Sequence, residues 1–173
     1  MRSIGIIGVG EIGRAITEGL CDGAERPPEV FLSPRGARTA AELAERYETV
    51  RVCAGDQAVV DRSDIVIIAV RGADRHDALD GLTADGGKVV INVMSGVGND
   101  DLRRTLGTGA ALVRAIPLPA VRERRSVTVT CPSHPVVDSL FESLGGALPV
   151  EDEASPTSPT ATSAASSRAS AAP

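Results

Sequence analysis

The stretch IGIIGVGEIGRAITEGL, residues 4–20, joins an apolar run to an amphipathic pattern across three glycines. The residues before Gly8 are typical of a buried strand, and apolar residues at helical spacing follow from Glu11 onward. The glycines at 8, 10 and 13 have the spacing GxGxxG. The stretch therefore predicts a strand, a tight turn and a helix in direct succession.

Each glycine of GVGEIG has a physical role in such a turn. Gly8 gives the turn a permissive backbone, Gly10 lets a pyrophosphate approach the chain, and Gly13 lets the helix pack closely on the sheet. The helix beginning at Glu11 directs unpaired N–H groups and the positive end of its dipole towards a phosphate. The alternative is a strand-to-helix turn without a ligand. We favour a dinucleotide site formed by Gly8, Val9, Gly10, Glu11, Ile12 and Gly13.

Apolar runs alternate with amphipathic windows further along the chain, which is the pattern of βαβ units in a parallel sheet. Strands are predicted at 3–8, 29–32, 50–53, 64–70, 88–93, 111–116 and 126–131. Helices are predicted at 11–21, 38–47, 57–61, 74–82, 100–106 and 135–144. We therefore expect an α/β fold, a Rossmann-type doubly wound and mainly parallel sheet with helices on both faces.

The composition changes at Glu151, where the segment EDEASPTSPTATSAASSRASAAP begins. No aliphatic side chain in this segment is larger than alanine, so it cannot bury enough apolar surface to offset the entropy lost on ordering. We expect one nucleotide-binding domain over residues 1–150 and a disordered, low-complexity tail over residues 151–173.

The charge pattern excludes several classes of protein. The formal net charge is −5 and the Lys and Arg residues are scattered, which argues against a nucleic-acid partner.

The apolar run at the start of the chain is too short and too rich in glycine for a signal peptide or a membrane span, so we expect a cytoplasmic protein. Cys21, Cys53 and Cys131 lie far apart, which predicts reduced structural thiols and no metal site.

The end of the second predicted strand indicates which dinucleotide is bound. An NAD site usually carries Asp or Glu about 20 residues after the glycines, where it binds the ribose hydroxyls. This chain has FLSPRGAR there, with Ser33 in place of the acid and Arg35 and Arg38 after it. Two cations suit a 2′-phosphate, so NADP(H) is favoured over NAD(H). The alternative is that both arginines are solvated residues at the start of a helix.

The remaining cofactor contacts are predicted from sheet geometry. In an open α/β sheet the ligand lies outside the carboxyl ends of the strands. Ala69, Val70 and Arg71 follow the fourth predicted strand and Ser95 follows the fifth, so we expect all four along the path of the cofactor. Without the glycine motif, ordinary loop chemistry would explain them equally well.

Five segments, in order, resemble the amino-terminal half of the pyrroline-5-carboxylate reductases. These enzymes belong to a wider group of NADP-dependent and F420-dependent oxidoreductase domains. The segments are IGIIGVGEIGRAI, LSPR, RSDIVIIAVR (similar to the family's SD and AVKP residues), INVMSGV (similar to an AGV segment) and VRAIP (similar to R-MPNTP). The resemblance covers roughly residues 3–150.

The resemblance implies a role for each matching segment. The glycine loop would hold the pyrophosphate, Ser33 and Arg35 the 2′-phosphate, and residues 69–71 the nicotinamide side of the ribose. Three positions depart from the family pattern. Asp56 stands where members often have Asn, and its carboxylate would repel a 2′-phosphate; Gly72 replaces the Pro of AVKP, and Leu118 replaces a polar residue of PNTP.

The resemblance also implies an activity, hydride transfer from NADPH to the cyclic imine pyrroline-5-carboxylate, which gives proline. Family members continue into a helical dimerisation domain that residues 151–173 do not match, so we expect an incomplete reductase that is a monomer or a weak dimer. No catalytic residue is assigned. Two alternatives stay open: a non-catalytic NADP(H)-binding module, and a reductase of the same group that acts on another imine or on F420.

Overall fold

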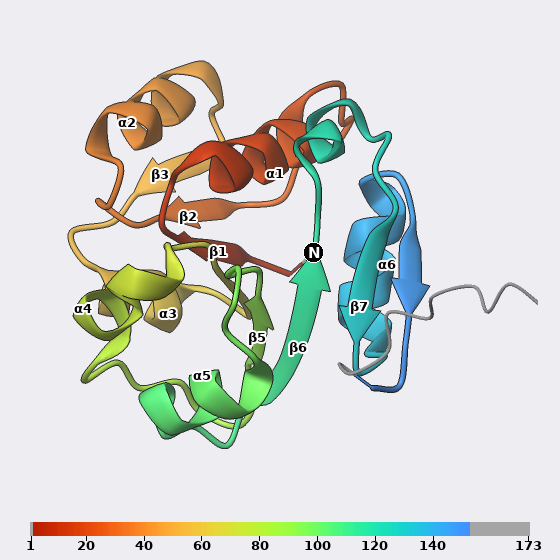
Figure 1. Cartoon of the computed structure of the whole chain (residues 1–173). Coiled ribbons are helices and arrows are strands. Elements are labelled where there is room, and N and C mark those ends of the chain that lie inside the picture. The colour runs from red at the N-terminus through yellow and green to blue at the C-terminus, as the bar shows by residue number, and fades with distance from the viewer. Residues whose placement is uncertain (1, 153–173) are drawn as a thin grey trace, which may run out of the picture.

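One eight-stranded sheet organises the computed structural model, which describes residues 2–152 (Figure 1). Its strands lie in the order β3-β2-β1-β4-β5-β6-β7-β8. Their bounds are β1 Ile4–Ile7, β2 Val30–Leu32, β3 Val50–Val52, β4 Ile65–Ile68, β5 Val89–Asn92, β6 Ala111–Ile116, β7 Thr128–Cys131 and β8 Ala147–Pro149. The predicted fold, a Rossmann-type and mainly parallel sheet, is confirmed.

The strand order creates the crevice in which such sheets bind ligands. Strands β1 to β6 pair in parallel, and Ile6 of β1 is in register with Leu32 of β2 on one side and with Ile67 of β4 on the other. Chain order reverses between β1 and β4, so the loops that follow these two strands diverge at the carboxyl edge. Strand β7 is antiparallel to β6, and β8 is parallel to β7.

Helices cover both faces of the sheet, as the near-continuous apolar strands require. Helices α1 (Glu11–Cys21), α2 (Ala37–Arg46) and α6 (Pro135–Ser143) pack through one buried apolar cluster, which includes Ile16, Leu43 and Phe141. Helices α3 (Asp56–Arg62), α4 (Arg75–Leu79) and α5 (Asn99–Leu106) pack through a second cluster, which includes Val59, Leu79 and Leu102. Two short 3₁₀ helices, η1 (Gly72–Asp74) and η2 (Pro119–Glu123), lie in the connections.

The two clusters follow the alternation of side chains along each strand. Ile4 and Ile6 belong to the first cluster and Ile7 to the second, while Ile67 and Ile68 divide in the same way. Each fully buried side chain of this size contributes about 1.5–3 kcal/mol relative to an exposed one. The centre of the sheet is therefore a rigid support for the loops at its carboxyl edge.

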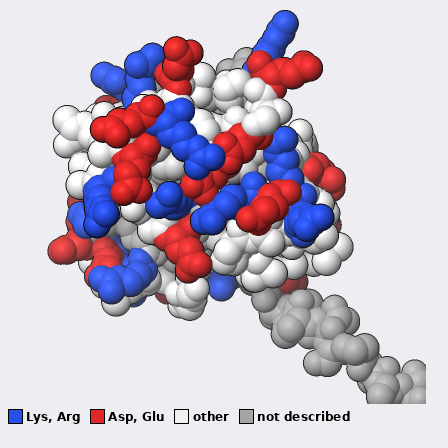
Figure 2. All heavy atoms as spheres, turned by 90° about the horizontal axis from the view of Figure 1, so that it is seen from above, with Lys and Arg blue, Asp and Glu red and all other residues white. Residues whose placement is uncertain are grey.

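A buried carboxylate joins the elements on the first face. Glu18 of α1 forms ion pairs with Arg14 of the same helix (Nε–Oε1 3.0 Å), Arg46 of α2 (Nη1–Oε1 3.4 Å) and Arg122 of η2 (Nε–Oε2 2.5 Å). Figure 2 shows this side of the molecule from above, with basic and acidic side chains interspersed over it. No area of one sign dominates the face shown, in keeping with the scattered charges of the sequence.

The structure differs from the sequence predictions at several boundaries. The segment 74–82, predicted as one helix, is the end of η1 followed by α4, which stops at Leu79 because Asp80 is extended and Gly81 has a φ of +83°. Strand β8 and η2 were not predicted. The tail predicted to be disordered lies almost wholly at 153–173, outside the described residues, and the division near residue 150 stays a prediction.

Candidate dinucleotide site

Two of the three motif glycines are required by the packing of the loop after β1. Gly8 has a φ of +91°, and a Cβ there would lie 2.8 Å from the backbone of Ala69 and Val70. A Cβ on Gly13 would lie 2.6 Å from the carbonyl oxygen of Gly8. These contacts agree with the roles predicted for Gly8 in the turn and for Gly13 in close helix packing.

Gly10 differs, because its surroundings are open. A Cβ there would meet no atom within 4 Å, and the residue is exposed as the N-cap of α1. The first bond that closes the helix runs from Arg14 N–H to Gly10 O, at 2.9 Å. The N–H groups of the residues between them have no acceptor within the helix, so they and the helix dipole can bind an anion at Gly10. Glu11 is exposed here and Ile12 is half-buried.

The loop after β2 packs directly against the glycine loop. Val9 N–H donates to the carbonyl oxygen of Arg35 at 3.0 Å, and Gly8 N–H donates to Ser33 Oγ at 3.0 Å. A Cβ on Gly36, whose φ is +81°, would lie 2.5 Å from Val9 O. Ser33 and Val9, which were predicted as cofactor contacts, are both buried and use these polar groups to fix the loop. Their contact with a cofactor stays a prediction.

The two arginines predicted to bind a 2′-phosphate have different surroundings. Arg35 Nε donates to Asp56 Oδ2 at 2.8 Å and Arg35 Nη2 donates to Asp77 O at 2.7 Å. Its side chain is 38% exposed, and that of Asp56 is 12% exposed. Arg38 is 93% exposed and pairs only with Glu42 on the next turn of α2, at 3.3 Å, among the contacts described. Arg38 is therefore the more available cation.

The loops after β4 and β5 lie at the same edge of the sheet. Ala69 and Val70 are half-buried beside Gly8, while Arg71 is exposed and pairs with Asp74 (Nε–Oδ2 2.7 Å). Ser95 is exposed, and a Cβ on Gly72 would lie 3.0 Å from its carbonyl oxygen. The structure thus brings together the loops that carry the predicted site residues.

One buried residue that shapes this edge was missed from sequence. Asn92 is fully buried at the end of β5, where its Nδ2 donates to Val97 O at 2.7 Å and its Oδ1 accepts from Met94 N–H at 3.0 Å. Arg114 also donates to Val97 O, at 3.2 Å. The two side chains hold the loop that carries Ser95. A polar residue within the apolar run KVVINV was the available signal.

An apolar surface follows β6 at the nicotinamide end of the predicted path. Ile116 is 53% exposed and Leu118 is 59% exposed. Ile116 is paired with Val129 of β7, and Val129 with Leu148 of β8, which is also exposed. Directly paired residues point to the same face of a sheet, so these three side chains form an apolar row on the face opposite α6.

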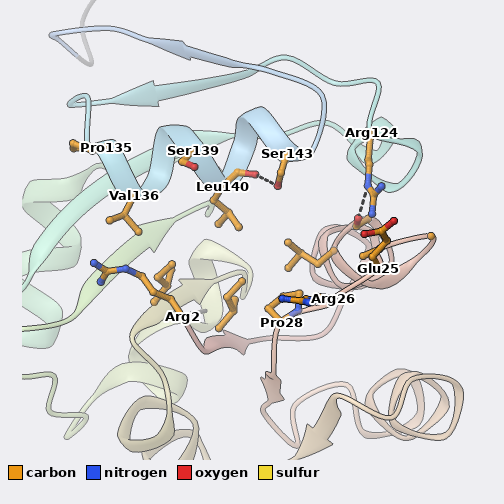
Figure 3. A pocket seen from close by; sticks show the side chains of 16 residues that line it. Arg2, Glu25, Arg26, Pro28, Arg124, Pro135, Val136, Ser139, Leu140 and Ser143 are labelled. Carbon is orange, nitrogen blue, oxygen red and sulfur yellow. Dashed lines mark hydrogen bonds between the residues drawn. The ribbon is translucent and has the colours of Figure 1, made fainter.

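A large groove among the described residues lies away from this site. It has a volume of about 880 Å³ and lies at the amino edge of the sheet, between the end of α1 and α6 (Figure 3). Val136 and Leu140 line it from α6, and Arg2 from the start of the chain. Arg124 closes one end and donates to Gly19 O at 2.9 Å and to Asp22 O at 2.7 Å, which caps α1.

The described part of the chain offers little to a metal ion or a membrane. Over residues 2–152, no three His, Cys, Asp or Glu side chains are grouped so that they could hold a metal ion. No helix of this part is both long and apolar enough to cross a bilayer. The three cysteines are buried, and burial raises the pKa of the Cys21 and Cys53 thiols. These two thiols are therefore poor nucleophiles.

Comparison with known proteins identifies the relatives of this chain. A pyrroline-5-carboxylate reductase of Mycobacterium tuberculosis is 29% identical over 167 residues, which cover 88% of this chain and 56% of the relative. One from Escherichia coli is 29% identical over 75% of this chain and 49% of its own length. The chain thus spans about half the length of these curated relatives.

Solved structures show the same fold. A pyrroline-5-carboxylate reductase from Streptococcus pyogenes is 24% identical and superposes with a TM-score of 0.71, over 87% of this chain and 58% of its own. The family model described as NADP oxidoreductase coenzyme F420-dependent matches residues 3–96, which is more than half of the chain and includes the glycine loop, the loop after β2 and the loops after β4 and β5. The chain therefore belongs to this family of NADP oxidoreductases, as its sequence predicted.

Proposed function

We propose that the chain is the NADP(H)-binding half of a reductase of the pyrroline-5-carboxylate type. The observation that carries the proposal is the loop after β1, where packing fixes Gly8 and Gly13 while Gly10 faces open space. A loop that served only as a turn would need no open approach to the unpaired amides of α1. The likeness to curated pyrroline-5-carboxylate reductases supports the reaction type.

The cofactor assignment rests on family membership and on the loop after β2. Members are NADP oxidoreductases, and this loop presents cations where an NAD site usually presents an acid. We assign the pyrophosphate to Gly10 and the amides of Glu11 and Ile12, and the 2′-phosphate side to Arg38 and Arg35. Residues 69–71 and Ser95 are assigned to the nicotinamide side.

The proposed reaction is reduction of a cyclic imine to an amine, here pyrroline-5-carboxylate to proline, in cytoplasmic proline biosynthesis. When bound, NADPH supplies the hydride. This chain's own residues would bind and orient the cofactor, and the apolar residues Ile116 and Leu118 would exclude water beside the nicotinamide. Groups that bind the substrate carboxylate would belong to a part that corresponds to the half of its relatives that this chain does not span. We propose a monomer or a weak dimer for the chain alone.

Calorimetric titration with NADPH, followed by addition of pyrroline-5-carboxylate, tests the proposal. Binding of NADPH together with its oxidation would support a reductase. Binding without oxidation, also after a substrate-binding half of a relative has been added, would support a non-catalytic module instead. If NADPH does not bind to a chain that circular dichroism shows to be folded, both interpretations are wrong. Sedimentation of the same sample tests the assembly state, and a tight dimer would contradict the proposal.

A further inference from the structure

We infer that Asp56 sets the coenzyme selectivity of this site by neutralising Arg35. The inference rests on the proposed NADP(H)-binding function and goes beyond it. It states that the Asp56 carboxylate determines how strongly the site prefers a nucleotide with a 2′-phosphate. It predicts a modest preference in the natural chain and a strong one when the carboxylate is removed.

The guanidinium of Arg35 is already engaged by groups of its own protein. Its Nε donates to Asp56 Oδ2 at 2.8 Å and its Nη2 donates to Asp77 O at 2.7 Å, so the guanidinium is held on two sides by its own protein. A phosphate that approaches Arg35 meets a pair whose charges cancel. A phosphate approaching a free arginine would instead gain a full charge-assisted bond.

Asp56 is largely buried and depends on its ion pair with Arg35. Its side chain is 12% exposed, and its Oδ1 is buried with no hydrogen-bond partner. Arg35 therefore forms the one ion pair of this carboxylate among the described residues. If Arg35 turned away to bind a phosphate, this largely buried carboxylate would lose its ion pair and keep only the partial compensation of the α3 N-terminus, which is unfavourable. The pair is thus expected to persist while the nucleotide is bound.

Arg38 is the cation that remains available to the 2′-phosphate. Arg38 is 93% exposed, and its contact with Glu42 is the weak kind of pair formed across one turn of a surface helix. An exposed cation in solvent discriminates less than a partly buried one, because water and salt screen its charge. The preference for NADP(H) then depends mainly on Arg38, and Asp56 limits what Arg35 can add.

A double-mutant cycle on positions 35 and 56 tests the inference. The probes are 2′,5′-ADP against 5′-ADP, and NADPH against NADH, titrated by calorimetry into the chain and three variants: Asp56→Asn, Arg35→Ala and the double variant. The measured quantity is the ratio of the affinity for the nucleotide that carries a 2′-phosphate to the affinity for the nucleotide that lacks it. Asp61→Asn is the matched control, because Asp61 is an exposed acid on the same helix and bonds to Gln57 rather than to an arginine.

The expected pattern follows from cancellation of the charges of Arg35 and Asp56. Asp56→Asn should raise the ratio about ten- to a hundred-fold, Arg35→Ala should lower it, and the double variant should return close to the natural chain, while Asp61→Asn should change it little. If Arg35 instead binds the phosphate independently of Asp56, the double variant will fall well below the natural chain, and the inference is wrong.

The experiment distinguishes failure of the inference from a folding defect and from failure of the proposed function. Each variant is first checked by circular dichroism, and the Arg35→Ala and double variants provide the comparison should Asp56→Asn be unfolded. Normal 5′-ADP binding with an unchanged ratio in folded Asp56→Asn would overturn the inference and leave the proposed function intact. Failure of every nucleotide to bind any folded variant would overturn both.

Discussion

Gly36 lies against the main chain of Val9, so that a methyl group on Gly36 would come within 2.5 Å of the Val9 carbonyl oxygen. Gly36 also has a left-handed backbone, with a φ of +81°. The substitution Gly36→Ala should cost roughly 2–4 kcal/mol in the free energy of unfolding, because it adds a clash to the usual left-handed penalty. It should also displace the glycine loop and weaken NADPH binding.

The control for Gly36 is Gly81, whose φ is +83° but whose missing Cβ would meet no atom within 4 Å. Gly81→Ala should cost only the left-handed penalty of about 1–2 kcal/mol and should not change NADPH affinity. Urea denaturation measures both variants. Equal losses for the two would show that contact with Val9 is unimportant.

Gly10 offers the opposite test, since a Cβ there has space in the protein and would meet only a ligand. We expect Gly10→Ala to change the free energy of unfolding by less than about 1 kcal/mol while reducing NADPH affinity at least about ten-fold. Gly109→Ala is the control, because Gly109 is also unobstructed and precedes β6 at the other edge of the sheet. Unchanged NADPH affinity in Gly10→Ala would refute the assignment of the pyrophosphate to this loop.

The buried carboxylate of Glu18 should matter for stability. Glu18→Gln removes the charge shared by Arg14, Arg46 and Arg122, and we expect a loss of about 1–3 kcal/mol in the free energy of unfolding. The loss stays below that of a fully buried pair because all three arginines reach solvent and can be hydrated again. Urea unfolding at low and high salt is the measurement.

Glu42 provides the comparison, since it also pairs with Arg14 but is exposed. Glu42→Gln should cost less than about 1 kcal/mol, and this cost should vanish at high salt. If both variants lost the same stability, burial of Glu18 would not be the cause.

The single tyrosine of the chain should titrate abnormally. Burial, followed by the 2.7 Å hydrogen bond to Asp22 Oδ1, raises the pKa of Tyr47 far above its usual value. A phenol whose pKa is raised on folding stabilises the folded state fully below its unfolded pKa of about 10, and this contribution is lost as the pH rises above that value. Stability should therefore fall at alkaline pH.

Phenolate absorbance measures this titration without interference, because the chain has one Tyr and no Trp. The folded protein should show no phenolate at pH values where the urea-unfolded protein is already ionised. Asp22→Asn should move the transition towards the usual range, although burial will keep it raised. Ordinary titration of folded Tyr47 would contradict the structure.

Much of the fold was predictable because its signals are local. The bounds of α1 and β6 agree with the predicted ranges 11–21 and 111–116, where the apolar pattern is strong and Gly10, Asp22 and Pro117 mark ends of the elements. The region of β8 has no such signal. It is three residues long, includes Pro149 and exposes Leu148, so its pairing depends on β7 rather than on its own sequence.

The site was predictable in its backbone but not in its side-chain pairs. Strand order and the glycine spacing indicate which loops meet at the carboxyl edge. The sequence does not show that Arg35 pairs with Asp56, which is 21 positions away, nor that Ser33 Oγ accepts a hydrogen bond from Gly8 N–H. Such choices depend on the distance between loops in space, and a loop of this kind is placed by the elements on either side of it.

The support of Gly8 by Ala69 and Val70 also has a consequence for the order of folding. During synthesis the glycine motif leaves the ribosome first, but the backbone against which it rests follows about sixty residues later. Strand β1 likewise lacks its central neighbour until β4 has been made. Until then the nascent chain exposes an apolar strand whose edge towards β4 is unpaired, a state prone to aggregation that chaperones protect. The glycine loop and the centre of the sheet should therefore form together, in one late step.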